Sequence, residues 1–287
     1  MLDCIKTFWR EYVRIKEDKE AFFHSCSSLL NSKHYHRLYR SLSSGKGEIL
    51  YYSSEDEKIY LKIESSTDRS MIVSTDSYYD IFLEIFVNKI YLLPPQISMK
   101  KFVVFDVGMN RGYASLYFAD IENCEHVYGF ELLSSTYKWA CDNIELNPYL
   151  SSKIDTFNFG LWNKDDEVCI ESDGIDGHTQ VSTGTNDIVK KSIVKKASGV
   201  LSGLFQSLDN NLLKILKIDV EGAEYKIFAD LYEQNIIKEL DLIIGEYHEG
   251  IENLMTYLPD FRCSYKEDSV EKGIGSMVFV NKKYSNI

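Results

Sequence analysis

The most regular hydrophobic pattern in the chain is an apolar run that ends in an acid and leads into a glycine loop. The run, Phe102–Phe105, is partly β-branched, which is typical of a strand buried on both faces of a parallel sheet. Asp106 ends the run, Gly108 and Gly112 follow, and apolar positions then recur with helical spacing. The pattern predicts a strand, a loop and a helix that packs back on the sheet, which is an α/β arrangement.

Other apolar runs end in the same way, with titratable residues directly after the last apolar position. They precede Glu131, Asp219, and the pair Glu246 and His248. Because the carboxyl ends of parallel strands meet at one edge of a sheet, we expect these side chains at the edge that carries the glycine loop. A further strand and its turn are expected over Ile154–Asn163.

The first part of the chain has a different pattern, with short amphipathic helices and one hairpin. Apolar residues at helical spacing predict helices over Leu2–His24 and Lys33–Leu42. Two alternating segments, GEILYY and KIYLKIE, predict a hairpin around the acidic turn Ser54–Glu57. We therefore predict an N-terminal helical and β-hairpin extension over residues 1–75. Its first helix is compatible with a docked helix, a lid, or a contact between copies in a homo-oligomer.

The second domain is predicted over residues 76–287. It begins with a third helix, SYYDIFLEIFVNKIY, which stops at Pro94 and Pro95. Residues 171–202 show no periodicity and are rich in Gly, Ser, Thr and Asp, which predicts a long substrate-facing loop. The paired lysines in this segment either meet an anionic sugar or form a solvated charged face.

The glycine loop predicts a ligand-binding turn. Glycine has no Cβ and accepts positive φ, so backbone amides can approach a ligand closely. The dinucleotide fingerprint Gly-x-Gly-x-x-Gly is absent, and Asp106 would repel a pyrophosphate. A cationic ligand such as S-adenosylmethionine would be attracted instead. Glu131 lies about 20 residues past the loop, where α/β nucleotide sites place an acid on ribose hydroxyls. An ordinary turn without a ligand is the alternative.

A set of motifs in a fixed order gives the chain a family resemblance. The motifs are DVGMNRG, VYGFE, NIELNP, FGLWN, KIDVEGAE and IIGEYH. Together they resemble an FkbM-type S-adenosylmethionine-dependent methyltransferase, with DVEGAE the most telling of them. The resemblance covers about residues 77–280. It implies a Rossmann-like class I methyltransferase fold, with a mostly parallel seven-stranded sheet in which GSMVFVNKK is an antiparallel last strand.

If the cofactor is S-adenosylmethionine, the loop residues take distinct roles. Asp106 would face the ammonium of the cofactor, and Glu131 would accept hydrogen bonds from its ribose. Gly108 and Gly112 would shape the loop, and Asn110 would bind the carboxylate end. The resemblance also places Asn158 beside the adenine, although a buried strand with a polar end explains Asn158 equally well.

Methyl transfer to an alcohol also needs a group that takes up the acceptor proton. Asp219, His248 and Glu246 are candidates because they follow strands that end at the same edge. Histidine titrates nearest neutral pH, while an aspartate at a strand end could instead hold a divalent cation. The DVEG motif stands where amine-methylating relatives carry an Asn-Pro-Pro-Tyr-like turn. The resemblance therefore implies an oxygen acceptor, a hydroxyl on a glycan or a small metabolite.

Composition narrows the class of protein further. The 287-residue chain has a net charge of -12, which argues against a nucleic-acid partner. No apolar run approaches the roughly 18 residues that span a membrane, and no signal peptide is recognisable, so we expect a cytoplasmic protein. The six cysteines form no CxxC pair, which indicates reduced structural thiols.

Two rival functions remain compatible with the sequence. One is an oxidoreductase that uses NAD or a nucleotide sugar on a similar sheet, which Asp106 and the missing glycine spacing disfavour. The other is a catalytically silent methyltransferase-like scaffold, which would keep the cofactor site and lose the base. Cofactor binding distinguishes the first rival, and methyl transfer distinguishes the second.

Overall fold

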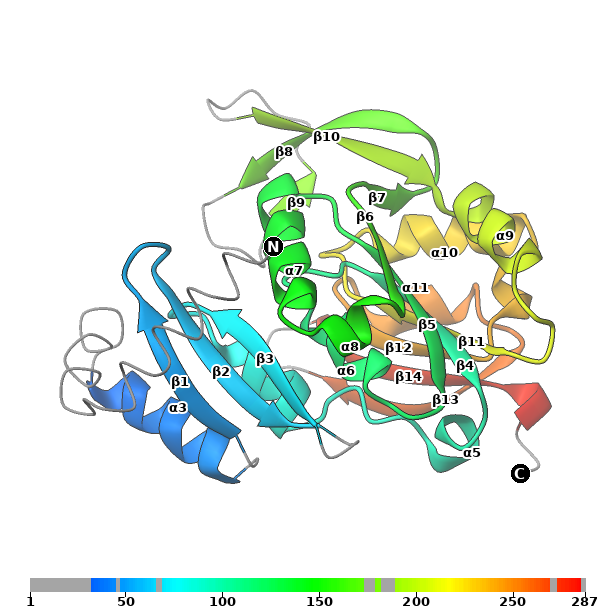
Figure 1. Cartoon of the computed structure of the whole chain (residues 1–287). Helices are drawn as coiled ribbons and strands as arrows, with labels where there is room; N and C mark the ends of the chain where they lie inside the picture. The colour runs from blue at the N-terminus through cyan, green and yellow to red at the C-terminus, as the bar shows by residue number, and fades with distance from the viewer. Residues whose placement is uncertain are drawn as a thin grey trace. The chain divides into compact units, whose positions relative to one another are not determined.

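The computed structural model describes residues 32–44, 47–65, 69–172, 179–181, 189–268 and 273–284 (Figure 1). The helix predicted over Leu2–His24 lies outside the described residues. Contacts divide the chain into two compact units, residues 1–92 with 142–151, and residues 93–141 with 152–287. The domain boundary after residue 75 stays a prediction, because a division by contacts does not show which part folds alone. Within the described ranges, no helix is long and apolar enough to cross a membrane.

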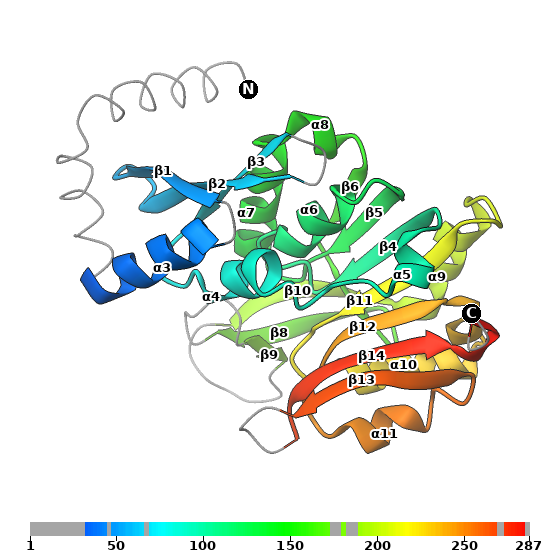
Figure 2. The same ribbon diagram turned by 90° about the horizontal axis from the view of Figure 1, so that it is seen from below.

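The larger unit is built on a seven-stranded sheet. Its strands are β4 (Phe102–Val107), β5 (Cys124–Phe130), β6 (Ile154–Phe157), β11 (Leu213–Ile218), β12 (Leu242–Tyr247), β13 (Phe261–Asp268) and β14 (Gly275–Asn281). Their order is β13-β14-β12-β11-β4-β5-β6 (Figure 2). The strands from β12 to β6 are parallel, and β14 runs antiparallel between β12 and β13. The predicted mostly parallel sheet with an antiparallel last strand is confirmed.

Helices cover both faces of this sheet. They are α6 (Tyr113–Ala119), α9 (Ala197–Gln206), α10 (Glu224–Glu233) and α11 (Ile251–Met255). Helices α9, α10 and α11 share one buried cluster with alternate residues of the strands, and α6 lies on the opposite face (Figure 2). Phe105 of β4, for example, packs against Phe205 of α9 with ring centroids 5.0 Å apart. Since neither face of β4 meets water, the strand is apolar at almost every position.

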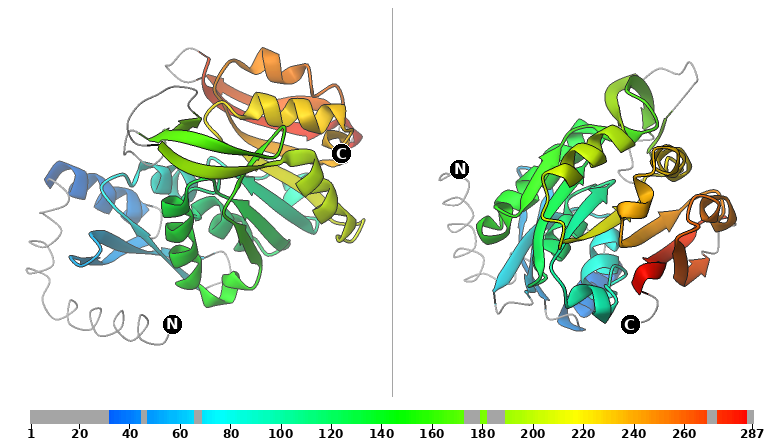
Figure 3. Two further views of the ribbon diagram at one scale, coloured as in Figure 1. Left: turned by 90° about the horizontal axis from the view of Figure 1, so that it is seen from above. Right: turned by 90° about the vertical axis from the view of Figure 1, so that its right-hand side faces the viewer.

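A second, smaller sheet lies in the same unit. It consists of β7 (Gly160–Trp162), β8 (Asp166–Ser172), β9 (Thr179–Val181) and β10 (Val189–Lys196). Its order is β7-β10-β8-β9, and β10 leads directly into α9 (Figure 3). The prediction of an unstructured loop over residues 171–202 is therefore wrong for the described part of that segment. Residues 173–178 and 182–188 lie outside the described residues.

Strand β10 and the start of α9 are stabilised by residues that lie elsewhere in the sequence. Strand β10 pairs antiparallel with β8 and parallel with β7, so that Val194 is buried while its neighbour Ile193 is exposed. At the start of α9, Asp230 of α10 accepts hydrogen bonds from the backbone amide of Ser198 at 2.7 Å and from its hydroxyl at 3.1 Å. The hydrophobic pattern of residues 171–202 alone does not reveal these pairing and hydrogen-bond partners.

The smaller unit contains a three-stranded antiparallel sheet and short helices. The elements are α3 (Ser32–Ser44), β1 (Gly47–Ser53), β2 (Lys58–Glu64), β3 (Ser70–Thr75), α4 (Asp80–Phe82) and the wider π-helical turn η1 (Leu83–Val87). The second predicted helix and the predicted hairpin are confirmed. Strand β3 was not predicted. The third helix is shorter than expected, because the chain leaves helical geometry at Lys89, whose φ is +56°.

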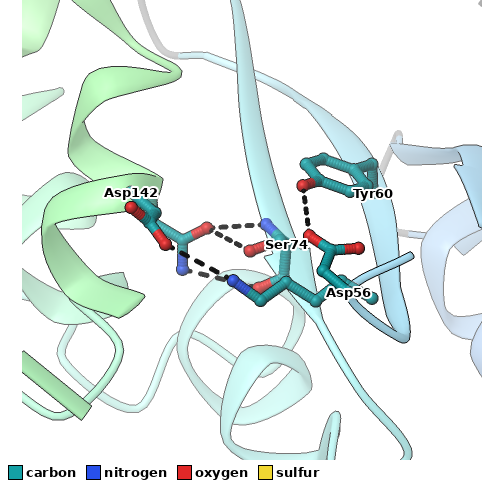
Figure 4. A network of polar contacts seen from close by, with 6 residues as sticks. Asp56, Tyr60, Ser74 and Asp142 are labelled. Atoms are coloured by element: carbon teal, nitrogen blue, oxygen red, sulfur yellow. Dashed lines mark hydrogen bonds and ion pairs between the residues drawn. The ribbon is translucent and has the colours of Figure 1, made fainter. Parts of the chain in front are cut away.

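Two asparagines pair with the backbone of β3 in the smaller unit. They lie at the end of α7 (Ser134–Glu145) and just before α8 (Pro148–Ser151). Asn147 accepts a hydrogen bond from Ile72 N at 2.8 Å and donates one to Ile72 O at 2.6 Å. Asn143 Oδ1 accepts from the amide and hydroxyl of Ser74 (Figure 4). The two amide side chains thus satisfy backbone groups that an edge strand leaves without a partner.

Candidate functional site

Asp106 and Lys217 form a buried ion pair at the carboxyl-terminal edge of the sheet. The register of β4 and β11 makes the two residues direct neighbours, so both side chains leave the same face. Asp106 Oδ1 and Lys217 Nζ are 3.1 Å apart, and Ser115 Oγ donates to Asp106 Oδ2 at 2.6 Å. Asp106 is 0% exposed. The expectation that Asp106 faces the cofactor ammonium stays a prediction, and within this structure the carboxylate contacts Lys217 and Ser115.

Lys217 connects the acids of three strands to the glycine loop. Burial lowers the pKa of its ammonium, but the nearby charges of Asp106, Asp219 and Glu246 outweigh burial, so the pKa lies above its ordinary value. The ammonium therefore stays charged, and it donates a hydrogen bond to Gly108 O at 2.6 Å. Because Glu246 is half-buried and its charge acts on Lys217, this acid also belongs to the group.

The backbone of the glycine loop has a conformation that side chains would not permit. Gly108 has a φ of +79°, and a Cβ there would lie 1.8 Å from the carbonyl oxygen of Asp219. Gly112 has a φ of +80°, and a Cβ there would lie 3.3 Å from Ala140. Asn110 also has a positive φ, +51°, which asparagine tolerates better than most residues. The predicted loop residues Gly108, Asn110 and Gly112 thus form one tight turn.

Glu131 holds the same loop from the neighbouring strand. Its Oε2 accepts a hydrogen bond from Asn110 N at 2.9 Å, and its Oε1 accepts one from Leu133 N at 2.8 Å. Burial raises the pKa of this carboxyl to about 7, although the hydrogen bonds from Leu133 and Asn110 act in the opposite direction. The charge of Asp106 also contributes to the increase. Glu131 and Asp106 therefore act on one loop from adjacent strand ends.

Asn158 lies beside Glu131 after β6. Its Nδ2 donates a hydrogen bond to Glu131 O at 3.0 Å, and its Oδ1 accepts one from Ser134 Oγ at 2.7 Å. The residue thus joins the ends of β5 and β6 to the start of α7. This geometry is compatible with both interpretations of Asn158, as a neighbour of adenine and as a polar strand end.

A second group of polar side chains gathers at the ends of β11 and β12. Asp219, Glu221 and His248 each bring one potential metal ligand atom within 4.8 Å of the others. His248 Nε2 is 3.5 Å from Glu221 Oε2, and His248 Nδ1 is 2.6 Å from Glu224 Oε1. The structure thus brings together Asp219 and His248, two of the three predicted catalytic residues. Glu221 and Glu224, which follow Asp219 in the DVEGAE motif, join them.

The surroundings of His248 decide its charge. Burial lowers the pKa of the imidazole, but the hydrogen bond to Glu224 and the charges of Glu224, Asp219 and Glu221 outweigh burial and raise the pKa to about 9. At neutral pH the ring carries a proton in this state. A protonated ring is less suited to take up the proton of an acceptor, and the catalytic role of His248 stays a prediction.

Several residues of the site escaped the sequence analysis. Lys217 could have been found, because a lysine inside the apolar run LKILKI is unusual in a strand covered on both faces. Arg111 is also buried, and its guanidinium lies 4.0 Å from the ring centroid of Trp139. No signal in the sequence indicated Ser115, which looks like an ordinary helical residue.

The residues at the glycine loop fit a small cationic cofactor. A Cβ at Gly108 would clash with the backbone carbonyl of Asp219, so this position of the turn requires glycine. The charges of Asp106, Asp219 and Glu246 outnumber the single ammonium of Lys217 on which they act, while Glu131, with a pKa of about 7, is only partly ionised at neutral pH. This surplus of negative charge suits an ammonium or sulfonium better than a phosphate.

Solved structures of methyltransferases resemble this chain only distantly. A solved FkbM methyltransferase from Methylobacillus flagellatus KT matches with a TM-score of 0.42 and 11% identity, over 63% of this chain and 43% of that one. TrmK from M. capricolum, in complex with S-adenosyl-homocysteine, matches with a TM-score of 0.38 and 14% identity, over 65% and 66%. Likenesses this distant carry no argument about substrate.

Sequence comparison is decisive for the family. No curated protein sequence matches the chain. The model of the methyltransferase FkbM domain matches residues 106–266, which begin near the end of β4, end within β13 and include every residue of the two groups described above. Because this match covers more than half of its residues, the chain belongs to the FkbM family of methyltransferases.

Proposed function

We propose that this chain is an S-adenosylmethionine-dependent O-methyltransferase that acts on a hydroxyl of a glycan or a small metabolite. One observation carries the proposal: Lys217 holds the glycine loop at Gly108 O, and Glu131 holds it at Asn110 N. A loop fixed at two points keeps its backbone groups in place for a small polar ligand. Its acidic surroundings favour a cation, and membership of the FkbM family supports methyl transfer.

The loop residues have separate roles in the proposed cofactor site. Gly108 and Gly112 give the turn its shape, and Asn110 binds the carboxylate end of the cofactor. Glu131 accepts hydrogen bonds from the ribose with lone pairs that its two backbone partners leave unused, since a carboxylate offers about four. Asn158 lies beside the adenine. We assign Asp106 a positioning role, because it holds the loop through Lys217.

The proposed reaction is an in-line displacement. When bound, S-adenosylmethionine supplies a methyl group that is already activated on a sulfonium. The acceptor hydroxyl gives up its proton, and its oxygen forms a bond to the methyl carbon. The carbon–sulfur bond breaks, and its electron pair stays on sulfur. Much of the acceleration is expected from positioning.

Asp219 is the proposed proton acceptor. Its backbone contacts the loop, because Asp219 N donates to Val107 O at 3.1 Å, directly before Gly108. A carboxylate at this strand end lies where an acceptor hydroxyl would meet the cofactor. Glu246 is the second candidate, and His248 is less suitable because of its raised pKa. An oxygen acceptor is supported by the DVEG motif, which replaces the turn of amine-methylating enzymes.

Cofactor binding tests the first part of the proposal. S-adenosylhomocysteine at ~100 times its dissociation constant should stabilise the fold by roughly 2.7 kcal/mol, because it binds only the folded chain. NAD should leave the melting temperature unchanged. The measurement is a thermal-shift titration with both ligands. Stabilisation by NAD and not by S-adenosylhomocysteine would favour the oxidoreductase and overturn the proposal.

Methyl transfer tests the second part. Mass spectrometry of candidate sugars and glycans, incubated with the chain and S-adenosylmethionine, should show the mass gain of one methylene group on a hydroxyl. Cofactor binding without transfer to any acceptor would favour the silent scaffold. Transfer to an amine would contradict the proposed acceptor class and leave the cofactor assignment intact.

A further inference from the structure

Asp219, Glu221 and His248 come from two strand ends that are adjacent in the sheet. Asp219 and Glu221 follow β11, and His248 follows the neighbouring strand β12. Their ligand atoms, two carboxylate oxygens and one imidazole nitrogen, lie within 4.8 Å of one another. In the described part of the chain this is the one group of three or more such residues that converges in this way.

A buried carboxylate outside this group orients the imidazole toward it. Glu224 is 0% exposed, and its Oε1 lies 2.6 Å from His248 Nδ1. The other ring nitrogen, Nε2, is therefore the one that faces Glu221. Metal-binding histidines show this arrangement, in which a carboxylate bonds to the ring nitrogen that does not bind the metal.

The second oxygen of Glu224 is an independent sign that the site needs a cation. Glu224 Oε2 is buried and has no hydrogen-bond partner within the described residues. A buried carboxylate oxygen without a partner is costly unless positive charge lies nearby. Three acids, Asp219, Glu221 and Glu224, thus gather around a single imidazole. A divalent cation bound by Asp219, Glu221 and His248 would offset most of the negative charge of these acids.

We propose that Asp219, Glu221 and His248 form a binding site for one divalent first-row transition metal ion, with Glu224 as the residue that orients His248. The donor set indicates the kind of ion. Carboxylate oxygens alone suit Mg²⁺ and Ca²⁺, whereas an imidazole nitrogen favours transition metal ions such as Fe²⁺ or Zn²⁺, and Mn²⁺ is the transition metal ion that also suits carboxylates. We therefore expect Mn²⁺ to bind more tightly than Ca²⁺.

The place of the site gives the ion a function, which rests on the proposed methyl transfer. Asp219 also borders the glycine loop, since its carbonyl oxygen leaves no room for a Cβ at Gly108. An ion held by Asp219 would thus lie beside both the cofactor and the acceptor. A divalent cation there would lower the pKa of the acceptor hydroxyl and orient it.

Metal binding to the full chain tests this inference directly. After the protein has been treated with a chelator and the chelator removed, Mn²⁺ is titrated in and free Mn²⁺ is followed by electron paramagnetic resonance. We expect one saturable site in the wild type. Glu221→Gln and His248→Ala should each weaken Mn²⁺ binding by at least about tenfold, and Glu224→Gln by about tenfold to 100-fold. A competition with Ca²⁺ should show the preference for Mn²⁺, and His248→Ala should lose it.

Glu249→Gln is the matched control, because Glu249 is an exposed carboxylate next to His248 and outside the proposed site. It should bind Mn²⁺ as the wild type does. Circular dichroism and melting curves check that each variant folds. No saturable Mn²⁺ site in the wild type, or equal losses in Glu249→Gln and Glu221→Gln, would overturn the inference.

These measurements test the metal site and the proposed methyltransferase function independently of each other. Mn²⁺ binding is measured without cofactor, and S-adenosylhomocysteine binding is measured in the presence of chelator. Cofactor binding without a Mn²⁺ site would remove only the metal inference. A Mn²⁺ site with the predicted variant effects, in a chain that binds no S-adenosylhomocysteine, would keep the site and remove the proposed function.

Discussion

Lys217 is a buried residue that holds the glycine loop from inside the sheet. It neutralises Asp106 inside the sheet and at the same time binds the carbonyl group of Gly108. A buried ion pair contributes little compared with an apolar pair of similar size, but removal of one partner is expensive because the other charge stays buried. Lys217 therefore connects the stability of the sheet with the geometry of the site.

Replacement of Lys217 by an uncharged residue should lower the free energy of unfolding. Lys217→Met leaves the buried Asp106 charge uncompensated, so we expect the free energy of unfolding to fall by about 3–5 kcal/mol, measured by urea denaturation. Lys214→Met, a half-buried lysine on the same strand, is the control and should cost much less. The double variant with Asp106→Asn should recover part of the loss. Equal costs for Lys217→Met and Lys214→Met would contradict the assigned role.

Asp219 has two proposed roles, as a proton acceptor and as a metal ligand, and both concern the reaction more than cofactor binding. We expect Asp219→Asn to lower turnover by about 10²–10⁴-fold, because the neutral amide takes up no proton. The affinity for S-adenosylhomocysteine should change by less than about twofold. Turnover is measured with an acceptor that the wild type methylates, and the exposed Asp209→Asn is the control. Unchanged turnover would remove Asp219 from the mechanism.

At the scale of elements, side chains form hydrogen bonds with backbone groups that have no partner within their own helix or sheet. Asn143 and Asn147 satisfy backbone groups of β3 in the smaller unit. Asp230 satisfies the amide of Ser198 at the start of α9 in the larger unit. Each of these side chains is buried and polar, so each costs stability if its partner is lost.

Strand β3 offers a direct test of this principle. Asn143→Ala leaves the buried amide and hydroxyl of Ser74 without their acceptor. We expect the variant to lose about 1–3 kcal/mol of stability, measured as the free energy of unfolding in urea. Glu145→Ala, at an exposed position of the same helix, is the control and should change stability by less than about 0.5 kcal/mol. A neutral Asn143→Ala would show that water replaces the side chain.

At the scale of the whole molecule, the central sheet places the acidic residues of the candidate site at one edge. Acids at the ends of β4, β5, β11 and β12 come from positions between 106 and 246 in the chain. Parallel strands align their carboxyl ends, so residues far apart in sequence meet without any local contact. The predicted fold and the predicted position of Asp106, Glu131 and Asp219 at this edge are therefore the parts of the sequence analysis that the structure supports most directly.

What the sequence determined by itself is the position along the chain of β4, β5, β6, β11 and β12 and of the acids at the strand ends. Those features follow from local periodicity, which each segment carries alone. Tertiary structure decided the partners. The pairing of Asp106 with Lys217 depends on the register of β4 and β11. Strand β10 forms because it pairs with β7 and β8. The charge of His248 depends on its contact with Glu224. These are contacts between residues 18 to 111 positions apart along the chain, and a local pattern contains no information about them.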